Sequence, residues 1–446
     1  MRTPIVDFVK AYADADVSRF HMPGHKGRAM LGCEPYDITE IKGADVLSDA
    51  DGVIAESEAY ASALFGARSF YSTEGSTLCI KTMLALVASE SKRQTRPLIL
   101  AARNVHKAFV YACALLDLRV EWLDPATPAH LCACPITARD VEKALDAMQE
   151  KPAAVYLTSP DYLGNLADVE GIAKVCRARS IPLLIDNAHG AYLRFLEPSQ
   201  HPISLGATMC CDSAHKTLPV LTGGAYLHLS PDAPFDAQTV RRRMALFAST
   251  SPSYLILQSL DLCNRYLSEN YPARLSACIE RLEKVKRMLV ACGFPSEQTE
   301  PLKLVLHASR FGYTGEELAE HLRQYAVEAE FADREYLVLM ATPETREEDF
   351  ARVERAFGAL SPRTVLNAGF PTDALAAERE VCLSIREAVM SPSESVAIDS
   401  AIGRVCASPT VSCPPAVPVV ISGERITENT VRLLQYYGIH SVEVVK

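Results

Sequence analysis

Short apolar runs alternate with longer amphipathic segments through the first half of the chain. Apolar runs typical of buried strands occur at residues 98–102, 119–123, 154–159, 182–190 and 223–230. The segments between several of them have the apolar spacing of helices, at residues 106–118, 138–150 and 171–180. Strands that alternate with helices in this way predict βαβ units and a mostly parallel sheet. We therefore predict an α/β fold with ligands at the carboxyl ends of the strands.

The pattern changes beyond Pro252. Residues 254–293 are predicted to be largely helical, and strands at 303–309 and 335–342 flank a helix at 316–327. This order predicts a smaller α+β domain, followed by a linker and a further α+β unit. The predicted division of the chain is an N-terminal arm (1–30), a large domain (31–250), a small α+β domain (251–360), a linker (361–373) and a C-terminal domain (374–446).

The composition is that of a globular protein. The chain has 446 residues, of which 48% are hydrophobic and 22% charged, and its formal net charge is −10. The acidic balance argues against a nucleic-acid partner, since phosphate contacts need basic surfaces. No apolar run reaches the roughly 18 residues of a membrane span, so no membrane partner is expected.

The cysteines and the N-terminus indicate the compartment. Fourteen cysteines are scattered without a CxxC pair, which predicts free thiols and no metal site. The first twenty residues carry scattered charges and no apolar core of a signal peptide. We therefore expect a cytoplasmic protein.

Two polar clusters follow predicted strands in the first part of the chain. Residues 74–77 open a helix, and there Ser76, Thr77 and backbone N–H groups could bind a phosphate. An ordinary helix cap is the alternative. His106 follows the strand at 98–102 and could stack on a flat ring, although a lone histidine is more often structural.

Two further clusters carry an acid and an amine. Asp186 ends an apolar strand, where its carboxylate could pair with the ring nitrogen of pyridoxal phosphate (PLP) or cap a turn. Lys216 follows His215, and a desolvated lysine amine reacts with aldehydes, whereas a surface lysine would not. The order of phosphate loop, histidine, aspartate and lysine predicts a PLP enzyme of fold type I.

The motifs around these residues resemble one family. They are HMPGHKG (21–27), FGARSFYSTEGST (65–77), RNVHKA (103–108), TSPDYLGNLADV (158–169), DNAHGA (186–191), SAHKTLPVLTGG (213–224) and CPPAVPVVISGE (413–424). Over nearly its whole length the sequence resembles the Orn/Lys/Arg decarboxylases, in a short form without an N-terminal wing domain. The resemblance implies a PLP-binding large domain like that of aspartate aminotransferase.

The resemblance also implies roles for individual residues. Lys216 would hold PLP covalently, Asp186 would bind its ring nitrogen, and His215 would assist proton transfer. His106 and Ala188 would cover the two ring faces. The implied cofactor-binding residues are Ser76, Thr77, His106, Asp186, Ala188, His189, Ser213, His215 and Lys216.

The implied reaction is decarboxylation of lysine, arginine or ornithine to the corresponding amine and CO2. The resemblance further implies a homodimer or larger homo-oligomer, in which residues 250–254 reach the partner's cofactor phosphate. A role in polyamine biosynthesis or in acid resistance is left open. Two alternatives are an inactive or altered family member with a binding or regulatory role, and a PLP enzyme with another reaction at Cα.

Three positions depart from the family's usual pattern. Asn187 stands where the family usually has Glu, Gly223 where it usually has Gln, and Asp161 where it usually has Thr. Asp161 could pair with the distal cation of a substrate or cap its own loop.

Overall fold

The computed structural model describes residues 1–90, 96–124, 133–366, 371–375, 379–409 and 417–446. The chain forms two compact units. The first contains residues 1–93, 153–156 and 169–272, and the second contains residues 94–152, 157–168 and 273–446. Part of the CPPAVPVVISGE motif, residues 413–416, lies outside the described residues.

A seven-stranded sheet has the order β1-β7-β6-β5-β4-β2-β3. Its strands are β1 (Arg68–Ser72), β2 (Leu98–Ala102), β3 (Arg119–Leu123), β4 (Ala154–Thr158), β5 (Leu183–Asp186), β6 (Met209–Asp212) and β7 (Ala225–Leu229). Strand β5 pairs parallel with β6, and β2 pairs parallel with β3, whereas β7 runs antiparallel to both β1 and β6. The predicted α/β fold with a mostly parallel sheet is confirmed.

Two strands of this sheet, β1 and β6, were not predicted from the sequence. Strands β1 and β6 are short and lie beside motif residues, so they lack a long apolar run. Both are nevertheless buried, because β6 is covered on both sides and β1 lies under α2 and α3. Periodicity also says nothing about strand direction, so the antiparallel course of β7 was not predicted.

The first unit surrounds its strands with helices. They are α1 (Pro4–Asp14), α2 (Val53–Phe65), α3 (Gly75–Glu90), α6 (Val169–Ala178), α7 (Ala214–Thr217), α8 (Ala237–Ala245) and α9 (Tyr254–Ser268), with short 3-10 turns at Glu34–Tyr36, Leu47–Asp49 and Ala191–Phe195. Helix α3 packs against β1, β5, β6 and β7. It is apolar nearly all round, as a helix buried on most faces must be.

The predicted helical stretch at 254–293 consists of two helices. Helix α9 ends at Ser268, and α10 (Tyr271–Ala291) begins after a break at Asn270, whose φ is +62°. A left-handed residue cannot continue an α-helix, and asparagine tolerates this conformation better than most residues. The break therefore has a local cause in the sequence.

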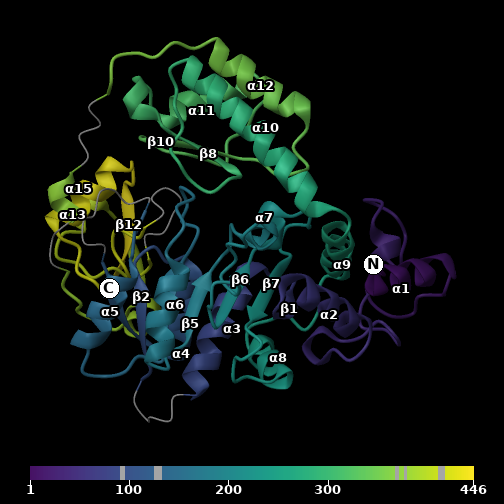
Figure 1. Ribbon diagram of the computed structural model, residues 1–446. Coiled ribbons are helices and arrows are strands. Elements are labelled where there is room, and N and C mark those ends of the chain that lie inside the picture. The colour runs from purple at the N-terminus through teal and green to yellow at the C-terminus, as the bar shows by residue number, and fades with distance from the viewer. Residues whose placement is uncertain (91–95, 125–132, 367–370, 376–378, 410–416) are drawn as a thin grey trace. The chain divides into compact units, whose positions relative to one another are not determined.

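The second unit contains the small α+β domain. Strands β8 (Lys303–His307), β9 (Phe331–Ala332) and β10 (Tyr336–Met340) form an antiparallel sheet of order β8-β10-β9. Helices α10, α11 (Gly315–Arg323) and α12 (Glu347–Gly358) lie beside it (Figure 1). Helix α11 begins with a capping box between Thr314 and Glu317. These elements match the predicted strands and helix closely.

The remaining elements of the second unit include the C-terminal segment. They are α4 (Lys107–Leu116), α5 (Ala138–Ala147), α13 (Thr372–Leu375), α14 (Ile385–Met390), α15 (Glu428–Tyr436), β11 (Ser393–Ala397), β12 (Ser441–Val445) and a 3-10 turn at Ile398–Ser400. Strands β11 and β12 pair antiparallel over a core that includes Cys406, Ile426 and Val444. Helix α14 packs on α4, where Arg386 donates to the carbonyl of Ala114.

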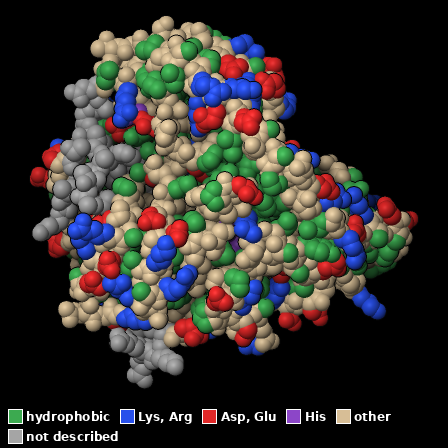
Figure 2. Space-filling model, in the orientation of Figure 1, with side chains coloured by type: hydrophobic (Ala, Val, Ile, Leu, Met, Phe, Trp, Pro, Cys, Tyr) green, Lys and Arg blue, Asp and Glu red, His purple; other side chains and the backbone are tan. Residues whose placement is uncertain are grey.

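Acidic and basic side chains are interspersed over the face shown in Figure 2. Many of them form ion pairs, such as those of Arg281 with Glu347 and Glu354. Within the described ranges, no helix is both long and apolar enough to cross a bilayer.

Candidate active site

Asp186 is fixed at the carboxyl end of β5. All four residues of the strand are buried, and the Asp186 side chain has an exposed fraction of only 2%. Its Oδ1 accepts a hydrogen bond from the backbone N–H of Ala188 at 3.2 Å and lies 3.5 Å from the thiol of Cys211. The hydroxyl of Tyr156 donates to Oδ2 at 3.4 Å. The carboxylate is therefore held in one orientation, as a partner for a cationic ring nitrogen must be.

Lys216 lies on the short helix α7, which directly follows β6. Its Nζ is 3.1 Å from Nε2 of His189. Since a lysine ammonium can only donate, Nε2 of His189 is the acceptor. Lys216 is exposed in the single chain, whereas His189 is buried. The structure thus brings His189, which follows Asp186 by three residues, to the amine of Lys216.

The predicted phosphate residues meet at the start of α3. Oγ of Ser213 donates to Oγ of Ser76 at 2.8 Å, although 137 positions separate the two serines. Thr77 follows in the first turn of this 16-residue helix. The early N–H groups of a helix have no partners within it, and the helix dipole favours an anion there. Hydroxyl and N–H donors therefore converge from two elements.

The turn before β7 explains the departure at Gly223. Its φ is +98°, and a Cβ at this position would lie 3.0 Å from the carbonyl oxygen of Thr73. The carbonyl of Gly223 also accepts the N–H of Gly75 at 2.7 Å, which ties this turn to the start of α3. Glycine fits this close approach, and a larger residue would push the two loops apart.

His215 is oriented by the same turn. Its Nδ1 lies 3.0 Å from the carbonyl oxygen of Gly224, which can only accept, so Nδ1 carries the proton. In the neutral ring Nε2 is then an acceptor. The residue as a whole is half-buried.

His106 belongs to the second unit. It is the N-cap residue of α4, and its Nδ1 accepts from the backbone N–H of Ala108 at 3.2 Å. The residue is exposed in the single chain. The other eight predicted site residues belong to the first unit.

Asp161 holds its own loop. The carboxylate accepts from the backbone N–H of Asn165 at 2.9 Å and from its side-chain amide at 2.8 Å. The buried amine of Lys303 donates to the carbonyl of Asp161 and pairs with Glu300 at 3.0 Å. Burial raises the pKa of the Asp161 carboxyl to about 6, against the hydrogen bonds from Asn165. These contacts favour the loop-capping interpretation over a contact with substrate.

Asn187, the third departure, leads to residues that sequence analysis missed. Its side-chain amide donates to Oδ1 of Asp212 at 2.6 Å, and Asp212 also faces His201 and His228. All four residues are fully buried. Asp212 precedes the SAHKT motif directly, but its partners are remote in sequence, so only the tertiary structure reveals the cluster.

The side chains present fit PLP. The fold places a lysine amine, a fixed buried carboxylate and a hydroxyl-lined helix N-terminus within the first unit. The amine can react with the aldehyde of the cofactor, the carboxylate can accept a hydrogen bond from its protonated ring nitrogen, and the hydroxyl and N–H groups can donate to its phosphate.

Comparisons with known proteins agree on one family. The model described as Orn/Lys/Arg decarboxylase, major domain, matches residues 3–296, and the one described as its C-terminal domain matches residues 373–442. A Bacillus subtilis protein described as uncharacterized protein YaaO is 29% identical over 97% of this chain and 94% of its own length. An arginine decarboxylase of Halalkalibacterium halodurans is 27% identical over 97% of this chain and 93% of its own length.

Solved structures show the same fold. Lysine decarboxylase LdcF of Francisella novicida superposes with a TM-score of 0.84 at 16% identity and covers all of this chain and 81% of its own. The constitutive lysine decarboxylase of Escherichia coli superposes with a TM-score of 0.80 at 17% identity, over 100% of this chain and 82% of its own. With the seven-stranded sheet, these likenesses confirm the fold type I prediction.

Proposed function

Because the chain belongs to the Orn/Lys/Arg decarboxylase family, we propose that it is a PLP-dependent decarboxylase of a basic amino acid. The products would be the corresponding amine and CO2. One observation carries the proposal: the amine of Lys216 lies beside His189, on the loop that begins with the buried carboxylate of Asp186.

In this proposal Lys216 holds the cofactor, and Asp186 keeps its ring nitrogen protonated. When bound, PLP supplies an electron sink for the electron pair that departing CO2 leaves behind. The Tyr156 hydroxyl and the Ala188 N–H orient Asp186, so its charge needs no rearrangement during the reaction. Lys216 and His215 are the candidates to return a proton to Cα, and the Gly224 carbonyl fixes the tautomer of His215.

The remaining predicted residues bind the cofactor. Ser76, Thr77 and Ser213 would hold the phosphate at the start of α3. Ala188 and His106 would cover the two faces of the ring, and His189 would lie at its edge. We keep the predicted large domain (31–250), small domain (251–360) and C-terminal domain (374–446) as part of the proposal.

The substrate is proposed to be arginine, lysine or ornithine, with arginine to be tested first. The Halalkalibacterium halodurans relative that matches nearly the whole chain is named arginine decarboxylase. A Bacillus cereus relative, 27% identical over 94% of this chain, carries the same name. Polyamine supply is the corresponding metabolic role.

We also propose that the protein is a homodimer or a larger homo-oligomer. The N-terminal arm and the residue that follows it expose four large apolar side chains close together in sequence: Phe20 (98% exposed), Met22 (70%), Met30 (87%) and Leu31 (89%). Apolar side chains exposed in this way mark a surface that a partner covers. The exposure of Lys216 also supports a site that a second copy completes.

The proposed compartment is the cytoplasm. Each cysteine within the described ranges has a free thiol, and most of these thiols are buried. Burial raises the pKa of several of them, for example that of Cys176 to about 12, which keeps them protonated and unreactive. Unreactive free thiols are typical of proteins in a reducing compartment.

The test uses the purified protein loaded with PLP. Arginine, lysine and ornithine are supplied separately, and agmatine, cadaverine and putrescine are quantified by mass spectrometry. Borohydride reduction followed by peptide mapping locates the cofactor, which we expect on Lys216. Lys216→Ala should abolish both the attachment and amine formation.

The outcomes separate the candidate functions. One dominant amine supports decarboxylation and names the substrate. Attached cofactor without any amine would contradict it in favour of an altered family member with a binding or regulatory role. A keto acid in place of the amine would indicate another reaction at Cα.

A further inference from the structure

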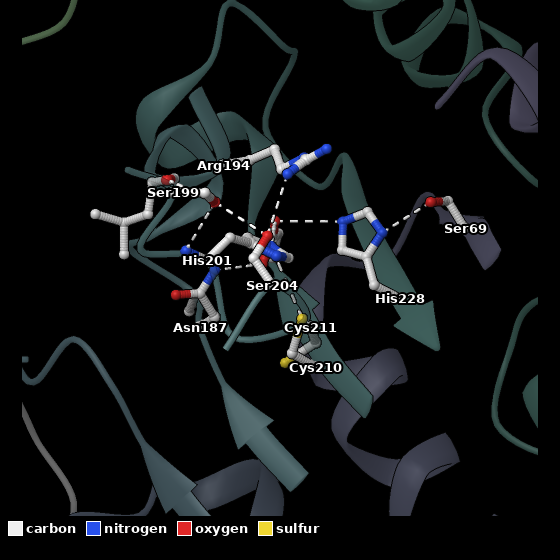
Figure 3. Close-up of polar contacts among 12 residues, drawn as sticks. Ser69, Asn187, Arg194, Ser199, His201, Ser204, Cys210, Cys211 and His228 are labelled. Atoms are coloured by element: carbon white, nitrogen blue, oxygen red, sulfur yellow. Dashed lines mark hydrogen bonds and ion pairs between the residues drawn. The ribbon is translucent and has the colours of Figure 1, made fainter. Parts of the chain in front are cut away.

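A fully buried polar cluster lies behind the proposed cofactor site. At its centre, Oδ1 of Asp212 accepts from the amide of Asn187 at 2.6 Å. Oδ2 lies 3.1 Å from Nε2 of His201 and 3.3 Å from Nε2 of His228. Figure 3 shows Asn187, His201 and His228 converging from separate parts of the first unit, with Ser69 bonded to the far nitrogen of His228 at 2.8 Å. We call Asn187, His201, Asp212 and His228 the Asp212 cluster.

One buried carboxylate lies at the centre of the cluster. Burial by itself would raise the pKa of the Asp212 carboxyl, but His201 and His228 outweigh it and hold that pKa below its usual range. Burial lowers the pKa of the His228 imidazole more than Asp212 raises it. Asp212 is therefore an anion that depends on nearby hydrogen-bond donors, because a side chain with no exposed surface is removed from bulk water.

The cluster connects the two strand ends that carry the proposed chemistry. Asn187 directly follows Asp186, and Asp212 directly precedes Ser213. The backbone N–H of Asn187 donates to the carbonyl of Cys211 at 3.0 Å, and the thiol of Cys211 lies against Asp186. Successive side chains of a strand point to opposite faces of the sheet. Cys211 and Asp212 therefore contact the end of β5 from opposite faces, Cys211 through Asp186 and Asp212 through Asn187.

A metal ion is the competing explanation. The ligand atoms of His201, Cys210 and Asp212 lie within 4.8 Å of one another. The contacts of Asp212 with Asn187 and His201 are already ordinary hydrogen bonds. A hydrogen-bonded network accounts for the geometry without an ion.

We propose that the Asn187–Asp212 hydrogen bond is a positioning device, which sets Asp186 on one strand against Ser213 and Lys216 on the next. The inference rests on the PLP binding proposed above and adds two positioning residues to it. Asn187 is a donor suited to a fixed anion. A glutamate there, the family's usual residue, would bring a second negative charge to Asp212.

A charge swap tests the bond without changing shape. Asn187→Asp places two carboxylates face to face in the core, and Asp212→Asn leaves two amides without their anion. The double variant N187D/D212N reverses the pair: the new amide donates to the new carboxylate, and its carbonyl oxygen still accepts from His201. We expect each single variant to bind PLP about tenfold more weakly or worse, and the double variant to recover most of the loss.

The readouts do not depend on turnover. They are the affinity of the apoprotein for PLP and the near-ultraviolet absorbance and circular dichroism of the bound cofactor, which report its tilt and surroundings. Asp261→Asn is the matched control, because Asp261 is another buried carboxylate of the first unit, bonded to Ser57 and to the N–H groups of Ile5 and Val6. It should alter the resistance to urea but not the cofactor signals.

Each outcome bears on the proposal. Shifted cofactor signals in both single variants, recovery in the double variant and an unchanged Asp261→Asn support it. Wild-type cofactor affinity and spectra in Asn187→Asp would overturn it, as would a double variant that folds but does not recover. One equivalent of metal in the purified wild type, lost in His201→Gln, would overturn it in favour of the ion. Failure of the wild type itself to hold PLP on Lys216 would refute the proposed function instead.

Discussion

At the scale of single residues, the two buried aspartates Asp186 and Asp161 differ in role because their hydrogen-bond partners differ. Asp186 has few donors, from Ala188 and Tyr156, and keeps capacity for a further partner. Asp161 is occupied by both donors of Asn165 within its own loop. In the sequence both aspartates come at or soon after the end of a predicted strand. Only their hydrogen bonds show that their roles differ.

The pKa of Asp161 gives a prediction for stability. Its pKa of about 6 lies above the ordinary value of 3.8, so the folded state binds its proton more tightly than the unfolded state. The stability that this proton contributes is present below pH 3.8 and is lost as the pH rises through about 6. The loss is about 3 kcal/mol, because a difference of one between the folded and unfolded pKa corresponds to roughly 1.4 kcal/mol.

Asp161→Asn should remove this dependence. Urea unfolding of both proteins at intervals between pH 4 and pH 7 would measure it. We expect the variant to gain stability relative to the wild type as the pH rises. A difference in unfolding free energy that is the same at every pH would contradict the assignment.

At the scale of elements, an ion pair joins the end of β2 to the C-terminal segment. Both guanidinium nitrogens of Arg103 donate to the carboxylate of Glu424 at 2.7 Å, and both side chains are buried. Arg103 also lies over the ring of Trp122 on β3. Because His106 follows three residues later, the segment around Glu424 helps to hold the loop that carries this proposed stacking residue.

Breaking this pair should be costly. Glu424→Gln leaves the Arg103 charge buried without its anion, and we expect a loss of about 3–5 kcal/mol in the free energy of unfolding. The double variant R103M/E424M removes both charges and should recover much of that loss, as measured by urea unfolding. Equal losses in the single and double variants would show that packing, not charge, holds the segments together.

At the scale of the whole molecule, the N-terminal arm bears on assembly. The loop at its end is held by Glu34, whose carboxylate accepts the N–H groups of Met30, Leu31 and Gly32. The exposed apolar side chains are thus presented by a fixed loop. A preformed apolar surface suits the interface that we propose between two copies.

Charged substitutions in the arm should dissociate the assembly. Phe20→Asp with Leu31→Asp places two anions in the proposed interface, and light scattering after size exclusion should give the mass of one chain, with loss of decarboxylation. Val290→Asp is the control, because Val290 is 57% exposed on α10 and lies outside the arm. An unchanged mass for the arm variant would show that the arm is not the interface.

The sequence by itself determined the fold class, most strand and helix positions and the choice of candidate cofactor residues. It could do so because periodicity depends on local burial, and because the motifs around the candidate residues resemble those of one family. The family resemblance implied that Ser76 and Ser213 both bind the cofactor, and the structure brings their hydroxyl oxygens to 2.8 Å.

The tertiary structure alone decided which neighbours each side chain has. The short strands β1 and β6 and the direction of β7 depend on packing. The partners of Asp212 come from three separate stretches of chain and share no spacing that a sequence could reveal. A buried charge is stabilised by the hydrogen-bond donors that lie next to it, and only the folded chain determines which donors these are.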